Sequence, residues 1–293
     1  MLRAVVAIVS DVRCIEYSAT GHPERPERIA ATMTRLQTQT DLELAWTEVA
    51  TFEDKLILRA HTSDHLRAID SAAAEFDADT PAYPAIGAHA RRSVGGALQA
   101  MRTALAGTPA FSLIRPPGHH ATADRAMGFC YLNAVAIAAL EARAAGIERV
   151  AVFDFDVHHG NGTEAILLNR PGIMFFSIHQ SPCYPGTGLA NVGRNCFNFP
   201  VPPRTARAEY RRVLETALAA LRKFDPQLVA VSAGFDAYAR DPLAEETLER
   251  EDFHWLGQQM RALDIPLFSV LEGGYSDDLP DLILAYLSGW DGG

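Results

Sequence analysis

Val150-Ala-Val-Phe-Asp-Phe-Asp-Val-His-His-Gly-Asn-Gly162 joins a hydrophobic run to a Gly-rich turn that carries two carboxylates, two imidazoles and an amide. Residues 150–153 predict a buried strand. Alternate side chains of a strand point to the same side, so Asp154, Asp156 and His158 share one face. Imidazole nitrogen and carboxylate oxygen both bind Zn²⁺, and a catalytic zinc has three protein ligands and one open position. The segment supplies part of such a ligand set, and the rest must come from elsewhere in the chain.

A strand end with capping acids and solvated histidines is the simpler explanation of any single polar residue in this segment. It explains poorly why five such groups fall within nine positions, residues 154–162. These positions follow the carboxyl end of a strand, where open α/β sheets bind their ligands. We therefore interpret the segment as part of a metal site.

Composition and charge narrow the class of protein. The chain has 293 residues, of which 48% are hydrophobic, and we expect a single domain spanning residues 1–293. A net charge of −10 argues against nucleic-acid binding, which needs an electropositive surface, although it would attract a cationic substrate. Sparse cysteines without a C-x-x-C pair indicate a reducing compartment; they are Cys14, Cys130, Cys183 and Cys196.

The opening segment Met1–Val9 is hydrophobic but too short to span a membrane, and it lacks the order of a signal peptide. We expect it to form the first buried strand. Because no other segment approaches the length of a membrane span, we predict a cytoplasmic protein without membrane contact. The sequence does not indicate the oligomeric state.

The order of elements along the chain predicts an α/β fold. Residues 21–28 form a turn into a helix that ends near Gln39, and helices are expected near residues 53–76 and 84–106. Short apolar runs then alternate with helical segments. The runs are 110–114, 149–155, 172–178, 227–232 and 266–271; the helices are near 132–145, 161–168, 205–224, 249–263 and 277–288. This alternation predicts βαβ units and a single-domain, three-layer α/β/α fold with a mostly parallel central sheet.

Polar segments follow the predicted strands, so we expect them to meet at one edge of the sheet. They are 115–120, 154–162, 177–179, 232–236 and 271–275. Asp236 can complete an Asp/His/Asp ligand set with Asp156 and His158, although a helix cap explains Asp236 equally well on its own. Asp241, which precedes Pro242, is interpreted as a turn residue. The stretch from residue 180 to 203, rich in Gly, Pro and Asn, is expected to be an irregular wall of the active-site mouth.

Two adjacent histidines on a Pro-Pro-Gly turn, His119 and His120, suit proton transfer from a metal-bound water and to a departing amine. Asp154 and Asn161 are expected to hydrogen-bond their rings. The charged partner raises the pKa of its histidine more than the amide does, so His120 should be the better base. A second metal site or an ordinary turn remains the alternative for this pair.

Four further positions border the expected site. Tyr275, on a Gly-Gly turn, can donate a hydrogen bond to an oxyanion, although an exposed loop tyrosine is the simpler explanation. Gly128, Phe129 and Tyr184 can form an aromatic channel, and the sequence does not distinguish channel aromatics from core aromatics.

Together these motifs resemble the zinc-dependent histone deacetylase family, including its bacterial histone deacetylase-like amidohydrolases, which have the arginase-deacetylase fold. The resemblance covers most of the chain, through residues 22–28, 115–121, 128–133, 154–163, 184–188, 234–236 and 272–275. It implies zinc bound by Asp156, His158 and Asp236, a catalytic pair His119 and His120, and Tyr275 as the donor that polarises the carbonyl.

The resemblance also implies binding residues around the metal. Phe129 and Tyr184 would line an acyl-lysine tunnel with Gly128 in its floor, Arg28 would lie in an internal pocket below the metal, and Asp79 would bind the substrate backbone. A structural K⁺ is implied beside the zinc. Its ligands would be Asp154, Asp156, His158, Ser177 and Ile178.

The chain departs from the family pattern at a few positions. Asn161 is the usual residue of the class II and bacterial branch, Tyr238 stands where histidine is frequent, and Tyr184 stands where phenylalanine is frequent. Leu243 occupies the position where polyamine-selective relatives carry a glutamate. An uncharged side chain there gives a free ammonium no partner and favours neutral acylated side chains, although the net charge favours a cation.

The leading hypothesis is a zinc-dependent amidohydrolase that removes an acetyl or other short acyl group from lysine side chains of a protein or peptide. The second is a deacetylase of small amines such as acetylated polyamines. The third, from another class, is a non-catalytic binder of acyl-lysine. The ligand types do not distinguish Zn²⁺ from Fe²⁺ or Co²⁺.

Overall fold

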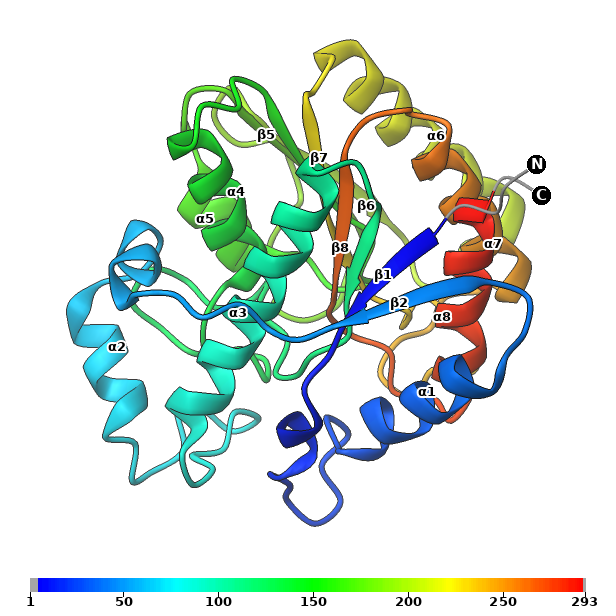
Figure 1. The fold of residues 1–293 in the computed structure, drawn as a ribbon. Coiled ribbons are helices and arrows are strands. Elements are labelled where there is room, and N and C mark those ends of the chain that lie inside the picture. Colours follow the sequence, from blue (N-terminus) through cyan, green and yellow to red (C-terminus); the bar gives the residue numbers. More distant parts are fainter. Residues whose placement is uncertain (1–4, 292–293) are drawn as a thin grey trace.

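The computed structural model describes residues 5–291, and its centre is one sheet of eight parallel strands (Figure 1). The strands lie in the order β2-β1-β3-β8-β7-β4-β5-β6. Their bounds are β1 Val5–Val9, β2 Glu43–Thr47, β3 Ala110–Ser112, β4 Val150–Asp154, β5 Ile173–Gln180, β6 Cys196–Val201, β7 Leu228–Ala233 and β8 Leu267–Leu271. Parallel neighbours require crossover connections, which the helices supply. The predicted sheet is confirmed.

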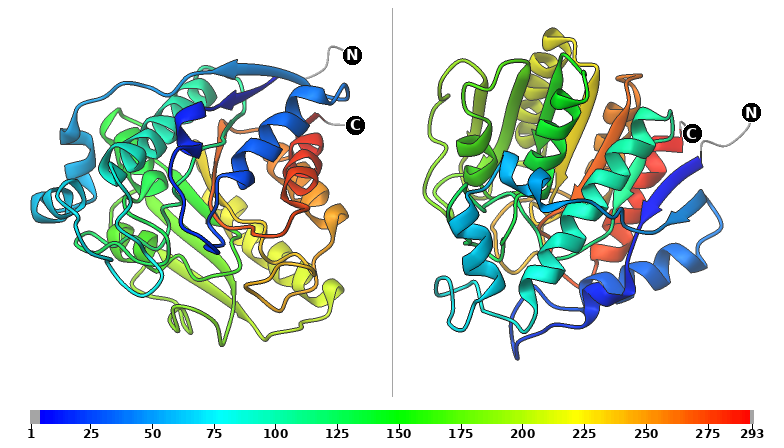
Figure 2. Two further views of the ribbon diagram at one scale, coloured as in Figure 1. Left: turned by 90° about the horizontal axis from the view of Figure 1, so that it is seen from below. Right: turned by 60° about the vertical axis from the view of Figure 1, so that its left-hand side comes forward.

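Helices cover both faces of the sheet and complete the predicted three layers (Figure 2). One face is covered by α1 Glu27–Thr38, α6 Arg207–Phe224, α7 Arg250–Arg261 and α8 Leu279–Ser288. The other is covered by α2 Ser63–Asp70, α3 Ile86–Leu105, α4 Ala134–Ala144 and α5 Asn161–Leu167. Strand β7 shows why both faces must be apolar, because Val229 and Val231 pack on one side while Leu228 and Ala230 pack on the other.

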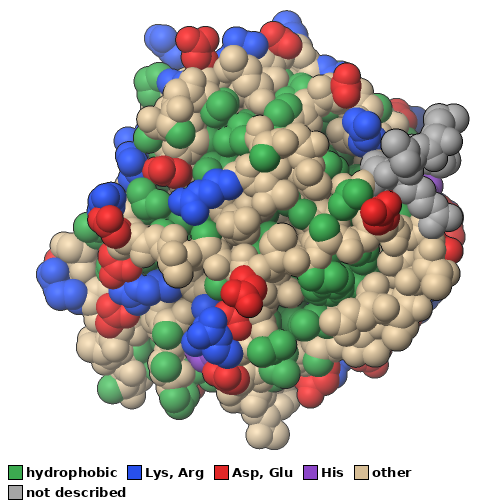
Figure 3. Space-filling model, in the orientation of Figure 1, with side chains coloured by type: hydrophobic (Ala, Val, Ile, Leu, Met, Phe, Trp, Pro, Cys, Tyr) green, Lys and Arg blue, Asp and Glu red, His purple; other side chains and the backbone are tan. Residues whose placement is uncertain are grey.

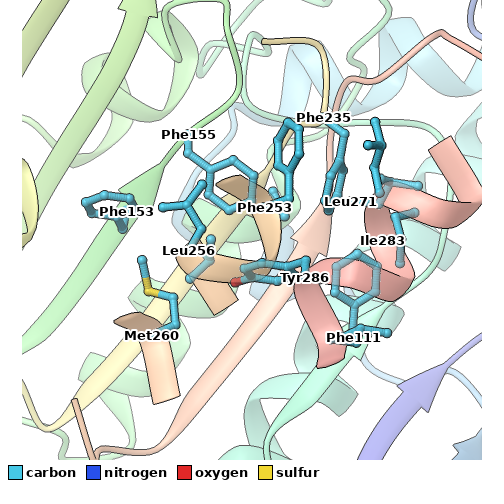
Figure 4. Packing of buried hydrophobic residues seen from close by; sticks show 14 of the residues in the cluster. Phe111, Phe153, Phe155, Phe235, Phe253, Leu256, Met260, Leu271, Ile283 and Tyr286 are labelled. Carbon is cyan, nitrogen blue, oxygen red and sulfur yellow. The ribbon is translucent and has the colours of Figure 1, made fainter. Parts of the chain in front are cut away.

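Aromatic side chains fill the layer between the sheet and helices α7 and α8 (Figure 4). Phe155 and Phe235 follow β4 and β7, and their ring centroids lie 5.7 Å apart. The ring of Tyr286 from α8 lies 5.4 Å from that of Phe155. Asp156 and Asp236 come directly after these two phenylalanines, so the packed core fixes the point from which each acid projects.

The helix predicted for residues 53–76 is wrong. A 3-10 helix, η2, spans Asp54–Arg59, and α2 spans only Ser63–Asp70. The chain breaks between them because the Thr62 side chain accepts a hydrogen bond from the backbone N–H of His65 and caps a new helix. Residues 71–76 are not helical.

The expectation of an irregular segment from residue 180 to 203 is also incorrect in part, because β6 lies within it as an edge strand beside β5. Asn198 and Pro200 obscured its apolar pattern, and proline is tolerated at a sheet edge. Strand β2, the opposite edge, was not predicted. Three of its five residues are exposed, and the two others are only partly buried, so its sequence has no continuous apolar face.

The predicted first strand, Met1–Val9, is present as β1, and residues 1–4 lie outside the described residues. Two further 3-10 helices are present: η1 Val12–Ile15 follows β1, and η3 Gly289–Asp291 continues directly from α8. Acidic and basic side chains are interspersed over the face seen in Figure 3. Within residues 5–291, no helix is both long and apolar enough to cross a membrane.

Candidate active site

The polar segments that follow the strands converge at one edge of the sheet, as expected for parallel strands. Asp156, His158 and Asp236 are buried, and their candidate ligand atoms lie within 4.8 Å of one another. His158 Nδ1 is 3.1 Å from Asp156 Oδ1 and 3.1 Å from Asp236 Oδ2. Two carboxylates and one imidazole around a common point form a donor set that fits Zn²⁺.

Backbone N–H groups hold the two carboxylates in place. Asp236 Oδ1 accepts from the N–H of Val157 at 2.8 Å, and Asp156 Oδ2 accepts from the N–H of Gly273 at 2.7 Å. Burial and the neighbouring charge of Asp156 raise the pKa of Asp236. A divalent cation between these acids would offset both effects, which supports the fit of a metal.

A second group of possible ligands, His119, Cys130 and Glu272, lies within the same 4.8 Å limit. Glu272 is already engaged, because its Oε2 accepts from the backbone N–H of Gly118 at 2.6 Å and of His119 at 3.1 Å. Its Oε1 accepts from the hydroxyl of Ser232 at 3.2 Å. A metal here would have to break these bonds, so this group is the weaker candidate.

The structure pairs the two histidines as the sequence analysis expected. His119 Nδ1 lies 3.1 Å from Asp154 Oδ2, and His120 Nδ1 lies 2.8 Å from Asn161 Oδ1. The two imidazole centroids are 4.0 Å apart. Gly118 lets the turn approach the chain closely, because a Cβ there would lie 2.7 Å from the backbone oxygen of Leu132.

The electrostatic environments of the two rings differ. Burial opposes the charged form of His119, but the negative charges of Asp156 and Asp154 raise its pKa to about 10. Burial and the positive charges of His119 and His158 lower the pKa of His120 well below its usual value. His119 is therefore the cationic ring and His120 the neutral ring that can accept a proton.

A cavity of about 420 Å³ opens over these groups. Most of its walls are apolar or aromatic, and His120 and His158 lie at its inner end. The lining residues are His22, Pro23, Ala78, Asp79, His120, Gly128, Phe129, His158, Tyr184, Leu243 and Tyr275. The structure thus brings together the predicted residues Gly128, Phe129, Tyr184, Leu243 and Asp79 with the buried ring of Tyr275.

Arg28 is not on the wall of this cavity. Its guanidinium lies behind Tyr275, 4.7 Å from the ring centroid, and donates to the carbonyl oxygens of Gly274 at 2.7 Å and Glu272 at 2.5 Å. Ser177 and Ile178 are buried in β5, where Ser177 pairs with Asp154 of β4 and its Oγ lies 2.9 Å from Nδ1 of His179.

Sequence reasoning missed lining residues contributed by two loops. His22 was interpreted only as part of a turn, but its Nε2 lies 3.2 Å from the backbone oxygen of Asp79 and its ring meets that of Phe129 edge-on at 4.7 Å. It joins the two loops at the cavity entrance. The motif that begins at His22 was visible, but nothing in the local pattern indicated its distant partners. Pro23 was noted only as part of that motif, and Ala78 gave no signal of its own.

Asp241 also has a larger part than its interpretation as a turn residue allowed. It lies in a turn, with its backbone N–H bonded to the oxygen of Tyr238 at 2.9 Å. In addition, its side chain is buried and bonded to the cavity-lining residues Leu243 and Tyr275.

Comparison with known proteins adds independent observations. The model of the histone deacetylase domain family matches residues 22–288. A probable deacetylase of Methanothermobacter thermautotrophicus is 40% identical over 289 residues, which cover 93% of this chain and 86% of the relative. The histone deacetylase-like amidohydrolase of Pseudomonas aeruginosa is 38% identical over 287 residues, which cover 89% of this chain and 74% of the relative.

Two solved structures have the same architecture. The HDA15 HD domain has a TM-score of 0.91 and 31% identity, with 99% of this chain and 90% of that chain covered. The acetylpolyamine aminohydrolase from Burkholderia pseudomallei has a TM-score of 0.88 and 28% identity, with 97% of this chain and 98% of that chain covered.

Proposed function

Since this chain belongs to the histone deacetylase family and has the arginase-deacetylase fold, we propose that it is a Zn²⁺-dependent deacetylase that hydrolyses the amide of acetylated or short-acylated lysine side chains. The observation that carries the proposal is the convergence of Asp156, His158 and Asp236 beside the His119–His120 pair at the end of an apolar cavity. A protein or peptide would present its acyl-lysine through that cavity. The unpaired cysteines support the cytoplasmic location expected from the sequence.

The triad would hold the zinc, which supplies a Lewis acid that polarises the carbonyl and lowers the pKa of water. Asn161 orients His120 so that its Nε2 is free to take the proton of the attacking water. His119, held cationic by Asp154 and Asp156, stabilises the negative charge that develops in the transition state.

The Tyr275 hydroxyl donates a hydrogen bond to the developing oxyanion, and the proton taken by His120 returns to the departing amine. The apolar walls formed by Phe129 and Tyr184 hold the methylene chain of the acylated lysine and exclude water from the amide. Asp79, exposed at the entrance, accepts hydrogen bonds from the substrate backbone.

We also propose a structural K⁺ beside the zinc, at Asp154, Asp156, His158, Ser177 and Ile178. Asp154 is fully buried, and it carries a negative charge next to the Asp156 backbone, whose N–H it accepts at 3.1 Å. A cation there would reduce the repulsion between the buried acids.

Replacing Tyr275 by phenylalanine tests the assignment. We expect kcat on an acetyl-lysine peptide to fall by about 10²- to 10³-fold, because one preorganised oxyanion donor is lost. The bound zinc, measured by mass spectrometry, should be unchanged because Tyr275 is not a ligand. Tyr286→Phe is the matched control: it removes another buried tyrosine hydroxyl, bonded to Ser269 at 3.0 Å, and should retain activity. Full activity of Tyr275→Phe would refute the role of Tyr275, and an inactive zinc-loaded wild type would refute deacetylation.

A second candidate function is deacetylation of small amines such as acetylated polyamines. The similarity to the acetylpolyamine aminohydrolase and the net charge of −10 favour it. The uncharged Leu243 at the cavity entrance weighs against it, because a free ammonium finds no partner there. The values of kcat/KM for acetyl-lysine peptides and acetylpolyamines, measured side by side, would decide between the two.

A further inference from the structure

One buried carboxylate, that of Asp241, connects two walls of the cavity. Its side chain accepts two backbone hydrogen bonds, from Leu243 N–H to Oδ1 at 2.9 Å and from Tyr275 N–H to Oδ2 at 2.7 Å. Asp241 is 7% exposed, so water competes little for either bond. Leu243 and Tyr275 both line the cavity, although 32 positions separate them in the sequence.

Tyr275 needs such an anchor because the chain before it is held only up to Gly274. The N–H of Gly273 is bound by Asp156, and the carbonyl oxygen of Gly274 is bound by Arg28. Gly274 itself has a φ of +112°, a conformation in which glycine is unusually free. The bond to Asp241 therefore fixes the backbone at the residue whose hydroxyl must reach the substrate carbonyl.

The ring of Tyr275 adds contacts that do not set its position along the chain. The ring meets that of Phe129 edge-on, with 5.7 Å between the two ring centroids. The guanidinium carbon of Arg28 lies 4.7 Å from the centroid of the Tyr275 ring. Contacts of this kind allow a ring to slide, whereas a short hydrogen bond between buried groups is directional. Asp241 supplies the directional contact.

We propose that Asp241 is a positioning residue that holds Tyr275 and Leu243 in register, so that the oxyanion donor and the apolar entrance act on the same bound acyl chain. The inference rests on the proposed deacetylase function. Two acceptor oxygens are required, one for each N–H. An asparagine at this position offers one acceptor oxygen and places an NH₂ group against the other N–H.

The test is Asp241→Asn, assayed alone and combined with Tyr275→Phe. Because a small misplacement of a catalytic group lowers turnover strongly, we expect Asp241→Asn to lower kcat about 10- to 100-fold at unchanged zinc content. In the Tyr275→Phe background, where the hydroxyl is absent, the same substitution should change kcat by less than about 3-fold. Equal losses in both backgrounds would mean that Asp241 only supports the fold, and would overturn the proposal.

Asp277→Asn is the matched control, since Asp277 is an exposed acid two positions from Tyr275 that pairs with Arg25 at the surface. Its kcat should stay within about 2-fold of the wild type, as for surface changes that touch no buried group. If Asp241→Asn does not fold, Asp241→Glu takes its place in the same cycle. It keeps both oxygens but displaces them by one methylene, so the same dependence on the Tyr275 hydroxyl is expected.

Hydrogen exchange at the Tyr275 amide separates this inference from the proposed function, because it needs no substrate. We expect exchange to be at least about 10-fold faster in Asp241→Asn than in the wild type and in Asp277→Asn. A wild type that is inactive on every acylated amine would refute the deacetylase function. The exchange rate of the Tyr275 amide would still show whether Asp241 holds the Tyr275 backbone. An active wild type with no change of exchange or of kcat in Asp241→Asn would refute the anchor alone.

Discussion

Replacing Glu246 by glutamine should stabilise the protein at alkaline pH and leave its stability at acidic pH almost unchanged. Glu246 is 3% exposed, and neither of its carboxylate oxygens has a hydrogen-bond partner. The buried hydroxyl of Tyr210 is also unpartnered. Burial raises the pKa of the Glu246 carboxyl to about 8; the nearby Thr205 backbone partly offsets the effect of burial, and the charge of Glu245 adds a smaller increase.

The sign follows from proton linkage. The pKa in the folded state is raised above its ordinary 4.5, so between pH 4.5 and about 8 the folded protein holds a proton that the unfolded chain has lost. Rising pH through this interval therefore lowers stability, and above it the loss is constant. One pH unit corresponds to about 1.4 kcal/mol, which sets an upper bound of about 5 kcal/mol. Because the charged side chain can relax toward water, we expect about 2 kcal/mol at pH 9.

Thermal unfolding of the wild type and Glu246→Gln at pH 5, 7 and 9 measures the effect. For a chain of this size, 2 kcal/mol corresponds to a rise in Tm of about 3 °C at pH 9. Glu245→Gln is the control, because Glu245 is half exposed and pairs with Arg204 at the surface. Curves of Tm against pH that run parallel for the wild type and Glu246→Gln would show that no buried charge forms, and would refute the reasoning.

Three further predictions concern the proposed site. Leu243→Glu should raise kcat/KM for an acetylpolyamine relative to an acetyl-lysine peptide by about 5-fold, because a carboxylate at the partly exposed entrance gives the free ammonium a partner worth about 1 kcal/mol. An unchanged ratio would place Leu243 outside the substrate path. Removal of the metal by a chelator should abolish hydrolysis and lower Tm, with both restored by Zn²⁺, since a ligand that binds the folded state stabilises it. Asp236→Asn should bind zinc more weakly by calorimetry; an unaltered affinity would remove Asp236 from the ligand set.

The convergence of Asp156, His158 and Asp236 and the parallel sheet could be foreseen because both depend on regularities of short range. The two-residue period of a strand orients the side chains that follow Val150–Phe153, and parallel strands end at one edge. These two rules place Asp156 and Asp236 together without any knowledge of the packing. The convergence of the two acids with His158 agrees with that reasoning.

The edge strands and the break before α2 could not be foreseen in the same way. Strand β2 has no buried face, and β6 contains Asn198 and Pro200, so neither shows the apolar pattern that identifies a strand. The break depends on one side chain, Thr62, whose hydroxyl can cap a helix or remain solvated. Where local propensity is ambiguous, tertiary contacts decide, and the sequence does not display them.

The two acids Asp241 and Glu246 show why the remaining part of the site depends on tertiary structure. Both lie in one short loop, and both are buried. Burial raises the pKa of Glu246 to about 8. Burial, together with the charge of Asp236, raises the pKa of Asp241 to about 7. Their partners differ. Protonation of Asp241 removes an acceptor from the N–H groups of Leu243 and Tyr275, whereas protonation of Glu246 relieves an uncompensated charge. The two N–H bonds favour the charged form of Asp241, but they do not outweigh its burial. Because both pKa values lie above that of an ordinary carboxyl group, rising pH lowers the stability of the folded protein at both positions, up to about 7 for Asp241 and about 8 for Glu246.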